Sequence, residues 1–286
     1  MGYLAAFLCA FLQTSKDLVS KRLAFRIDGT LSAFASFAFA LPFYVLLLLV
    51  LYLTGNEAFA CSWLFFRFVL LRSVTDTAAE WLKMSALGAG DISLVSCFFT
   101  LSPFFLLFTS PLITGDQIST VGVAAVLITV AGSLILVYEP GAQSKFKLSH
   151  GRAILLALLS AFFFSLNSCF DRLAVQSASA AFSGFAMTAL SGLFILPFVF
   201  RRRDAVLDLQ LNRRNLLLRG AIEVVFMVTK LLALQYLPAQ YVAGIQRTSL
   251  IYSIIGGRVI YREEQFAKRF IAGVIILIGA LLILVA

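Results

Sequence analysis

The sequence has very little of the chemistry on which most enzymes and metal sites depend. Only one of its 286 residues is a histidine, His150, and its four cysteines are scattered without Cys-x-x-Cys spacing. Neither a disulfide framework nor a metal site is indicated, and we interpret the cysteines as small buried apolar residues. Walker motifs and Gly-x-Ser-x-Gly nucleophile turns are also absent from the sequence. We therefore do not expect an enzyme, and we expect no cofactor.

Charged residues are scarce as well, at 13% of the sequence against 61% hydrophobic residues. A soluble domain of this size cannot bury so much apolar surface, so the bilayer has to be the solvent. A transmembrane helix needs about 20 apolar residues. The sequence predicts an all-α polytopic membrane protein with ten transmembrane helices joined by short loops. The predicted spans are 2–20, 31–53, 62–82, 91–112, 118–138, 152–173, 181–200, 215–235, 239–260 and 267–286.

The net charge of +9 comes from basic residues at the ends of the predicted helices. Three arginines at 201–203 follow one span, and Lys145, Lys147 and Arg152 precede another. Such charges set membrane topology beside anionic lipid, so we do not expect a nucleic-acid partner. Most of these residues lie in the connections after odd-numbered helices. The positive-inside rule then predicts that these connections are cytoplasmic and that both termini lie outside.

Two parts of the sequence correspond when one is shifted by 147 residues, with no gap across residues 72–132. The coinciding pairs are Arg72 and Arg219, Asp76 and Glu223, Lys83 and Lys230, Asp116 and Glu263, and Gly132 and Gly279. Charges inside lipid-spanning helices are costly and are mostly retained for function. A doubled set of them therefore indicates a duplicated membrane unit.

A polar linker at 139–150 divides the predicted helices into a first repeat of five, residues 1–140, and a second repeat of five, residues 151–286. Because five is odd, the second copy enters the membrane with opposite polarity. The sequence therefore predicts a 5+5 inverted repeat, an arrangement found in secondary transporters. The first helices of the two halves correspond at a shift of 150, which places Asn167 at the position equivalent to Asp17.

A face of charges runs along one helix in each predicted repeat. Spacings of four, four and three residues place the members of the first set on one helical face. These are Arg72, Asp76, Glu80 and Lys83, and the second set is Arg219, Glu223 and Lys230. Both faces are expected to point inward, because charges facing lipid are costly. Asp76 and Glu223, at the middle of their helices, are the best candidates for a carboxylate that binds a proton or the substrate.

Other interpretations of these charges stay open. Arg72 with Asp76 and Glu80 with Lys83 are spaced to form internal salt bridges that neutralise one another. Lys83 and Lys230 alternatively extend to the membrane interface from helix ends. Arg247 lies eight residues into a predicted helix, where it needs an acid, a carbonyl or an anionic substrate. The complete set of predicted substrate-binding residues is Lys16, Asp17, Arg72, Asp76, Glu80, Lys83, Asn167, Glu223, Lys230 and Arg247.

Three segments of the second half resemble a known family: 233–239, 245–249, and the acidic pair Glu263-Glu264 followed by Gly273 and Gly279. They resemble the ten-helix EamA-like branch of the drug/metabolite transporter superfamily. The first half departs from the family pattern, with Asp116 where glutamate is usual and Ala125 where glycine is common. The resemblance implies export or exchange of small metabolites through a central cavity formed by both halves. It also implies cytoplasmic termini, against the charge distribution, so orientation stays open.

The sequence thus predicts a multi-pass secondary transporter of the cell (inner) membrane. It would export or exchange a small polar metabolite, such as an amino acid, by alternating access. Proton coupling is open, one chain suffices for a complete site, and a dimer is compatible with it. One alternative is a multidrug or cation exporter of the same fold. The others are a non-transporting membrane scaffold and an intramembrane enzyme.

Overall fold

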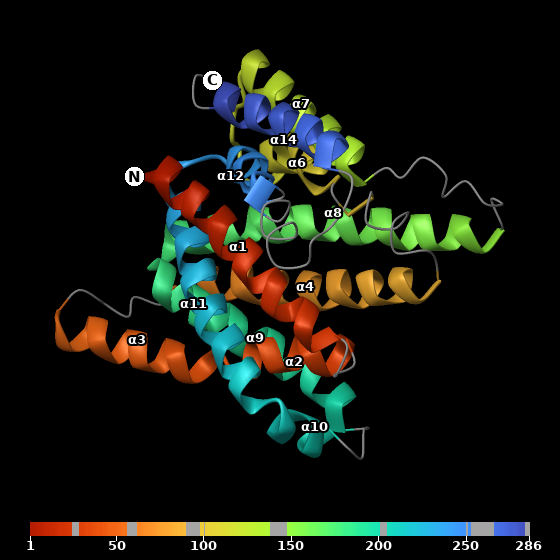
Figure 1. The fold of residues 1–286 in the computed structure, drawn as a ribbon. Helices are drawn as coiled ribbons and strands as arrows, with labels where there is room; N and C mark the ends of the chain where they lie inside the picture. Colours follow the sequence, from red (N-terminus) through yellow and green to blue (C-terminus); the bar gives the residue numbers. More distant parts are fainter. Residues whose placement is uncertain are drawn as a thin grey trace. The chain divides into compact units, whose positions relative to one another are not determined.

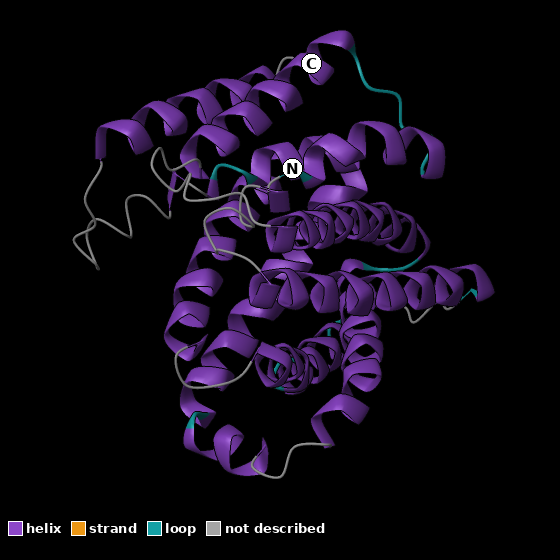
Figure 2. Cartoon of the chain, turned by 90° about the vertical axis from the view of Figure 1, so that its right-hand side faces the viewer, coloured by secondary structure: helices purple, strands orange, loops and turns teal. Residues whose placement is uncertain are grey.

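The chain is helical throughout the part described by the computed structural model, and no strand occurs there (Figure 2). This confirms the predicted all-α class. The described residues are 1–24, 29–55, 62–89, 98–99, 101–137, 148–200, 205–249, 251–252 and 266–283. They form two compact units, each considered by itself below. Unit 1 contains residues 1–77 and 170–236, and unit 2 contains residues 78–169 and 237–286.

Each unit takes segments from both sides of the predicted linker at 139–150, of which residues 139–147 lie outside the described part. The boundaries between the units fall within two long helices, α4 (Trp63–Ala89) and α8 (Leu148–Ser177). Unit 1 further contains α1 (Gly2–Ala24), α2 (Gly29–Ala38), α3 (Leu41–Leu53), α9 (Ala180–Phe200), α10 (Ala205–Leu211) and α11 (Arg213–Tyr236) (Figure 1). Unit 2 further contains α6 (Ser102–Ile113), α7 (Thr120–Val137), α12 (Ala239–Gln246) and α14 (Phe266–Ile283).

Three helical segments are apolar and long enough to cross a bilayer: Ala33–Leu53, Gly151–Ser177 and Ala180–Val199. Shorter apolar helices cover Ser102–Ile113, Thr120–Gly132 and Gly273–Ile283. Helices α1, α4 and α11 have 23, 27 and 24 residues, which is sufficient length, but they carry the charged residues discussed below. The structure thus supports a multi-pass membrane protein, while the count of ten spans and the 5+5 repeat stay predictions.

Two predicted spans are interrupted. The span predicted at 31–53 consists of α2 and α3, separated by a turn at Phe39–Ala40. Pro42 stands in the first turn of α3, where its missing N–H is tolerated. The span predicted at 239–260 begins with α12, which ends at Gln246, and residues 253–265 lie outside the described part.

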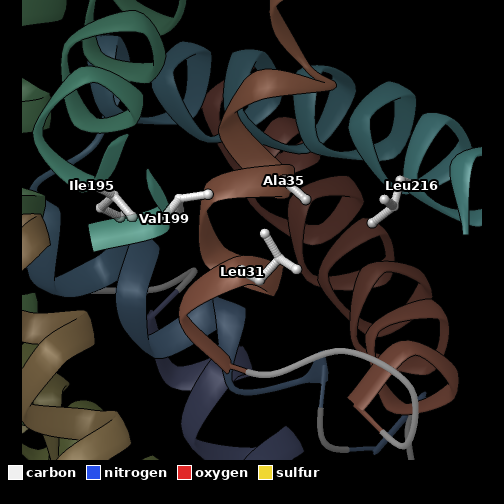
Figure 3. Close-up of a cluster of buried hydrophobic side chains, with 5 residues drawn as sticks. All are labelled: Leu31, Ala35, Ile195, Val199 and Leu216. Atoms are coloured by element: carbon white, nitrogen blue, oxygen red, sulfur yellow. The ribbon is translucent and has the colours of Figure 1, made fainter. Parts of the chain in front are cut away.

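A cluster of buried apolar side chains joins α2, α9 and α11 in unit 1 (Figure 3). Leu31 and Ala35 come from α2, Ile195 and Val199 from α9, and Leu216 from α11. In a membrane, such contacts gain van der Waals packing rather than transfer energy, so close fit matters more than apolar area. The cluster holds α11, which carries two of the predicted site residues, against α2 and α9.

In unit 2, α7 and α14 lie side by side in opposite directions and meet at glycines (Figure 1). A side chain at Gly132 of α7 would overlap Ile276 of α14, and a side chain at Gly279 of α14 would overlap Thr129 of α7. These two contacts are reciprocal under the 147-residue shift, because Gly132 corresponds to Gly279 and Thr129 to Ile276. A two-fold relation between α7 and α14 would produce this pattern.

Candidate functional site

Unit 1 contains a buried ionic network centred on a carboxylate of α8. The side chain of Asp171 is 0% exposed and accepts hydrogen bonds from two cations. Arg72 Nε lies 3.1 Å from Oδ1, and Lys230 Nζ lies 2.6 Å from Oδ2. Arg72 Nη1 also donates to Asp76 Oδ2 at 2.9 Å and to Ser191 Oγ at 3.2 Å. One arginine and one aspartate thereby connect α4, α8, α9 and α11.

The register between α8 and α11 follows from backbone contacts beside the network. Arg172 Nη1 donates to the carbonyl of Leu234 at 2.7 Å, and Gln235 Nε2 donates to the carbonyl of Val175 at 3.4 Å. Both contacts place the segment of α8 at 172–175 beside the end of α11 at Leu234 and Gln235. Lys230 lies about one turn before Leu234 on α11, and this register brings its ammonium to Asp171.

A second ion pair in unit 1 joins α1 to α11 and is looser than the first. Lys16 Nζ lies 3.3 Å from Glu223 Oε2, and the two side chains are 20% and 15% exposed. The same ammonium lies 4.0 Å from the centre of the Phe226 ring, within the range of a cation–π contact. Glu223 is therefore held by one cation at longer distance, whereas Asp76 is tightly bound and only 6% exposed.

These charges balance. The network of Arg72, Asp76, Asp171 and Lys230 contains two acids and two bases, and the pair of Lys16 and Glu223 contains one of each. Buried charges survive only when they are paired in good geometry. A ligand that binds here must therefore exchange with an internal partner rather than meet an unpaired charge.

Four other predicted site residues, Glu80, Lys83, Asn167 and Arg247, lie in unit 2. Lys83 Nζ is 3.4 Å from Glu80 Oε1, and their side chains are 35% and 24% exposed. Both salt bridges that the spacing along α4 allowed are thus present. Asn167 is buried in α8, and Arg247 follows the last residue of α12. The side chain of Asp17 lies outside the described part.

Sequence reasoning missed Asp171, the residue at the centre of the network. At the 150-residue shift, Asp171 corresponds to Lys21, which has the opposite charge. Pairing residues of the same charge between the two halves therefore does not find it. Helical spacing could have found it, because Asp171 lies one turn after Asn167 on the same face. Among the residues that the structure describes, no group of three His, Cys, Asp or Glu side chains is placed to hold a metal ion.

Comparison with known proteins identifies the family that this chain resembles. The model of the EamA-like transporter family matches residues 151–285, nearly the whole second predicted repeat. This confirms the resemblance drawn from the second half of the sequence and supports a membrane transporter in general. No curated protein sequence matches.

Solved structures show the fold alone. One structure, described as "Crystal structure of protein", superimposes with a TM-score of 0.78 over 100% of this chain and 99% of its own. Its sequence is 14% identical to this one, which is too low to transfer function.

Proposed function

We propose that this chain, whose residues 151–285 match the EamA-like transporter family, is a secondary transporter of the cell (inner) membrane. It exports or exchanges a small polar metabolite, such as an amino acid, by alternating access through a central cavity. The observation that carries this proposal is the pair of charge-balanced groups in unit 1: the network around the buried Asp171, and the partly exposed pair of Lys16 and Glu223. Ionisable residues within transmembrane helices line substrate and ion pathways far more often than they serve packing.

Balanced pairs favour a zwitterionic substrate. An ammonium and a carboxylate on one small molecule can take the places of a lysine and a glutamate without leaving a net charge in the membrane interior. A substrate with one charge would leave one protein side chain unpaired and buried, which is strongly unfavourable.

Glu223 is the residue best suited to this exchange. Its ion-pair partner among the described residues, Lys16, lies at 3.3 Å, and both side chains remain partly exposed. Asp76 and Asp171, in contrast, are held by Arg72 at 2.9 and 3.1 Å. Glu223 is therefore our proposed site for the substrate ammonium, and a proton that binds this carboxylate would couple transport to the proton gradient.

Replacement of Glu223 by glutamine tests the proposal. Purified protein in liposomes loaded with an unlabelled amino-acid mixture should accumulate labelled amino acids by counterflow, above empty liposomes. E223Q is expected to reduce the initial rate at least tenfold, because a neutral amide cannot exchange a cation. The rate should also lose its response to an imposed pH gradient.

The matched control is D208N, which likewise replaces a carboxylate by its amide, at a half-buried residue of α10 in unit 1 that lies outside the predicted substrate-binding set. It should fall within about twofold of the wild-type rate, because this carboxylate belongs to neither the Asp171 network nor the pair of Lys16 and Glu223. Equal counterflow by E223Q and wild type, or no accumulation by wild type of any amino acid, would contradict the proposal.

A second candidate, export of organic cations, is favoured by one observation. The ammonium of Lys16 contacts both the carboxylate of Glu223 and the ring of Phe226. An acid beside an aromatic ring can bind the cationic group of a ligand in the same way. The same liposomes distinguish the two functions. Accumulation of labelled tetraphenylphosphonium without accumulation of amino acids would favour the cation exporter.

A further inference from the structure

Helix α12 of unit 2 carries two buried polar groups without hydrogen-bond partners in the described part of the chain. The side chain of Gln240 is 0% exposed, and neither its amide oxygen nor its amide nitrogen has a partner. The Nε atom of Arg247, just past the end of the same helix, is likewise buried and unpartnered. Buried polar groups are nearly always hydrogen-bonded in native proteins, so each exception needs an explanation.

Helical geometry places both groups on one face. Seven residues separate them, close to two turns, and Arg247 keeps helical backbone angles of φ −64° and ψ −18°. Helical side chains lean toward the N-terminus, so the long side chain of Arg247 extends back toward Gln240. The face between them carries the small residues Ala243 and Gly244, and the side chain of Ile283 of α14 packs against Gly244. Helix α12 packs against α6, α7 and α14, so this face lies inside unit 2.

Capping of the helix does not account for the guanidinium. The carbonyl of Gly244 accepts the backbone N–H of Arg247 at 3.1 Å. The carbonyl of Ile245 accepts both the N–H and the hydroxyl of Thr248, at 3.0 and 2.8 Å. The carbonyls of Gly244 and Ile245 are thus engaged by other donors.

The acids described in unit 2 do not account for it either. Glu80 pairs with Lys83, and Asp116 accepts hydrogen bonds from Thr114 and Ser110 at 2.7 and 3.2 Å. No ion pair joins either carboxylate to Arg247 among the described residues. An oxyanion would supply the partner that the buried Nε of Arg247 lacks among the described residues.

We propose that Gln240 and Arg247 form a binding site for an oxyanion, a carboxylate or phosphate group. The guanidinium offers paired N–H donors that suit both groups. The Gln240 amide nitrogen adds a further donor, and its oxygen can accept from a hydroxyl or amine beside the anion. The site binds its ligand whether or not the chain transports anything.

The test is thermal unfolding of the full chain in nanodiscs, with and without anions at constant ionic strength. In neutral phosphatidylcholine discs, 10 mM phosphate or acetate is expected to raise the wild-type midpoint by about 2 °C or more above chloride. R247Q and Q240L should lose this shift. R152Q, which removes an exposed arginine of α8, should keep it. A second arm replaces part of the phosphatidylcholine by phosphatidylglycerol without added phosphate or acetate.

The Q240E variant keeps the test decisive if R247Q fails to fold. It places a carboxylate inside the proposed site, on the same helical face as Arg247. The variant should therefore unfold at a higher temperature than wild type without added anion and should no longer respond to phosphate. Arginine-dependent stabilisation by soluble anions identifies a solute site, and stabilisation by anionic lipid alone identifies a headgroup site. If neither arm stabilises the wild type, or if R247Q and Q240E respond as the wild type does, the oxyanion site is wrong.

Discussion

Replacement of Asp171 by asparagine is expected to be the most damaging single change in the chain. Among the described residues, it would leave Arg72 without one of its two carboxylate partners and Lys230 without its carboxylate, while their side chains stay only 10% and 14% exposed. Removal of one member of a buried ion pair typically costs about 3–5 kcal/mol. We therefore expect D171N to unfold far below the wild-type temperature in the same lipid, or to yield little monodisperse protein.

A double variant separates loss of charge balance from loss of the side chain itself. D171N combined with K230M removes one acid and one base, and Arg72 keeps Asp76 at 2.9 Å. This variant should recover more than half of the lost unfolding temperature, measured by intrinsic fluorescence in nanodiscs. E80Q removes one member of a more exposed pair, which should cost no more than about 1 kcal/mol of unfolding free energy. Its unfolding midpoint should therefore stay close to that of the wild type. A D171N protein as stable as wild type would contradict the central role of this carboxylate.

The helical class and most helix positions could be predicted because lipid imposes one strong rule. Backbone polar groups in the bilayer have to be satisfied within the segment, so long apolar stretches have to be helices. This is why the predicted spans 118–138, 181–200 and 215–235 nearly coincide with α7, α9 and α11. The turn at Phe39–Ala40 was not predicted, because the sequence remains apolar from Ala33 to Leu53 and hydropathy does not register a local change of direction.

The site was predictable where its residues lie on one helix and much less so across helices. Spacing along α4 predicted the pairs of Arg72 with Asp76 and of Glu80 with Lys83, and both are present. Nothing in the sequence pairs Lys230 with Asp171 or Lys16 with Glu223. Those contacts depend on the register between helices, which small residues and close packing determine rather than charge pattern.

Replacement of Gly220 by alanine is expected to have the second-largest effect, because the close approach at this residue leaves no room for a side chain. An added Cβ on α11 would overlap the carbonyl of Phe39 and lie 2.9 Å from the nitrogen of Ala40. Both atoms belong to the backbone of the turn between α2 and α3, which cannot swing aside as a side chain would. Overpacking typically costs about 1–3 kcal/mol, so a lower unfolding temperature in nanodiscs is expected. G151A is the matched control, since nothing lies within 4 Å of its added carbon, and it should be neutral or slightly stabilising.

The G220A variant is also expected to displace Glu223, the proposed binding residue for the substrate. Glu223 lies three residues after Gly220, less than one turn along α11, so a helix displaced from the α2–α3 turn carries this carboxylate with it. Its pair with Lys16 of α1 already stands at 3.3 Å, and further separation would weaken it. G220A should therefore lower counterflow more than its remaining folded fraction explains, when rates are normalised to monodisperse protein in the liposomes. If normalised flux equals that of G151A, the contact at Gly220 supports stability alone and does not position Glu223.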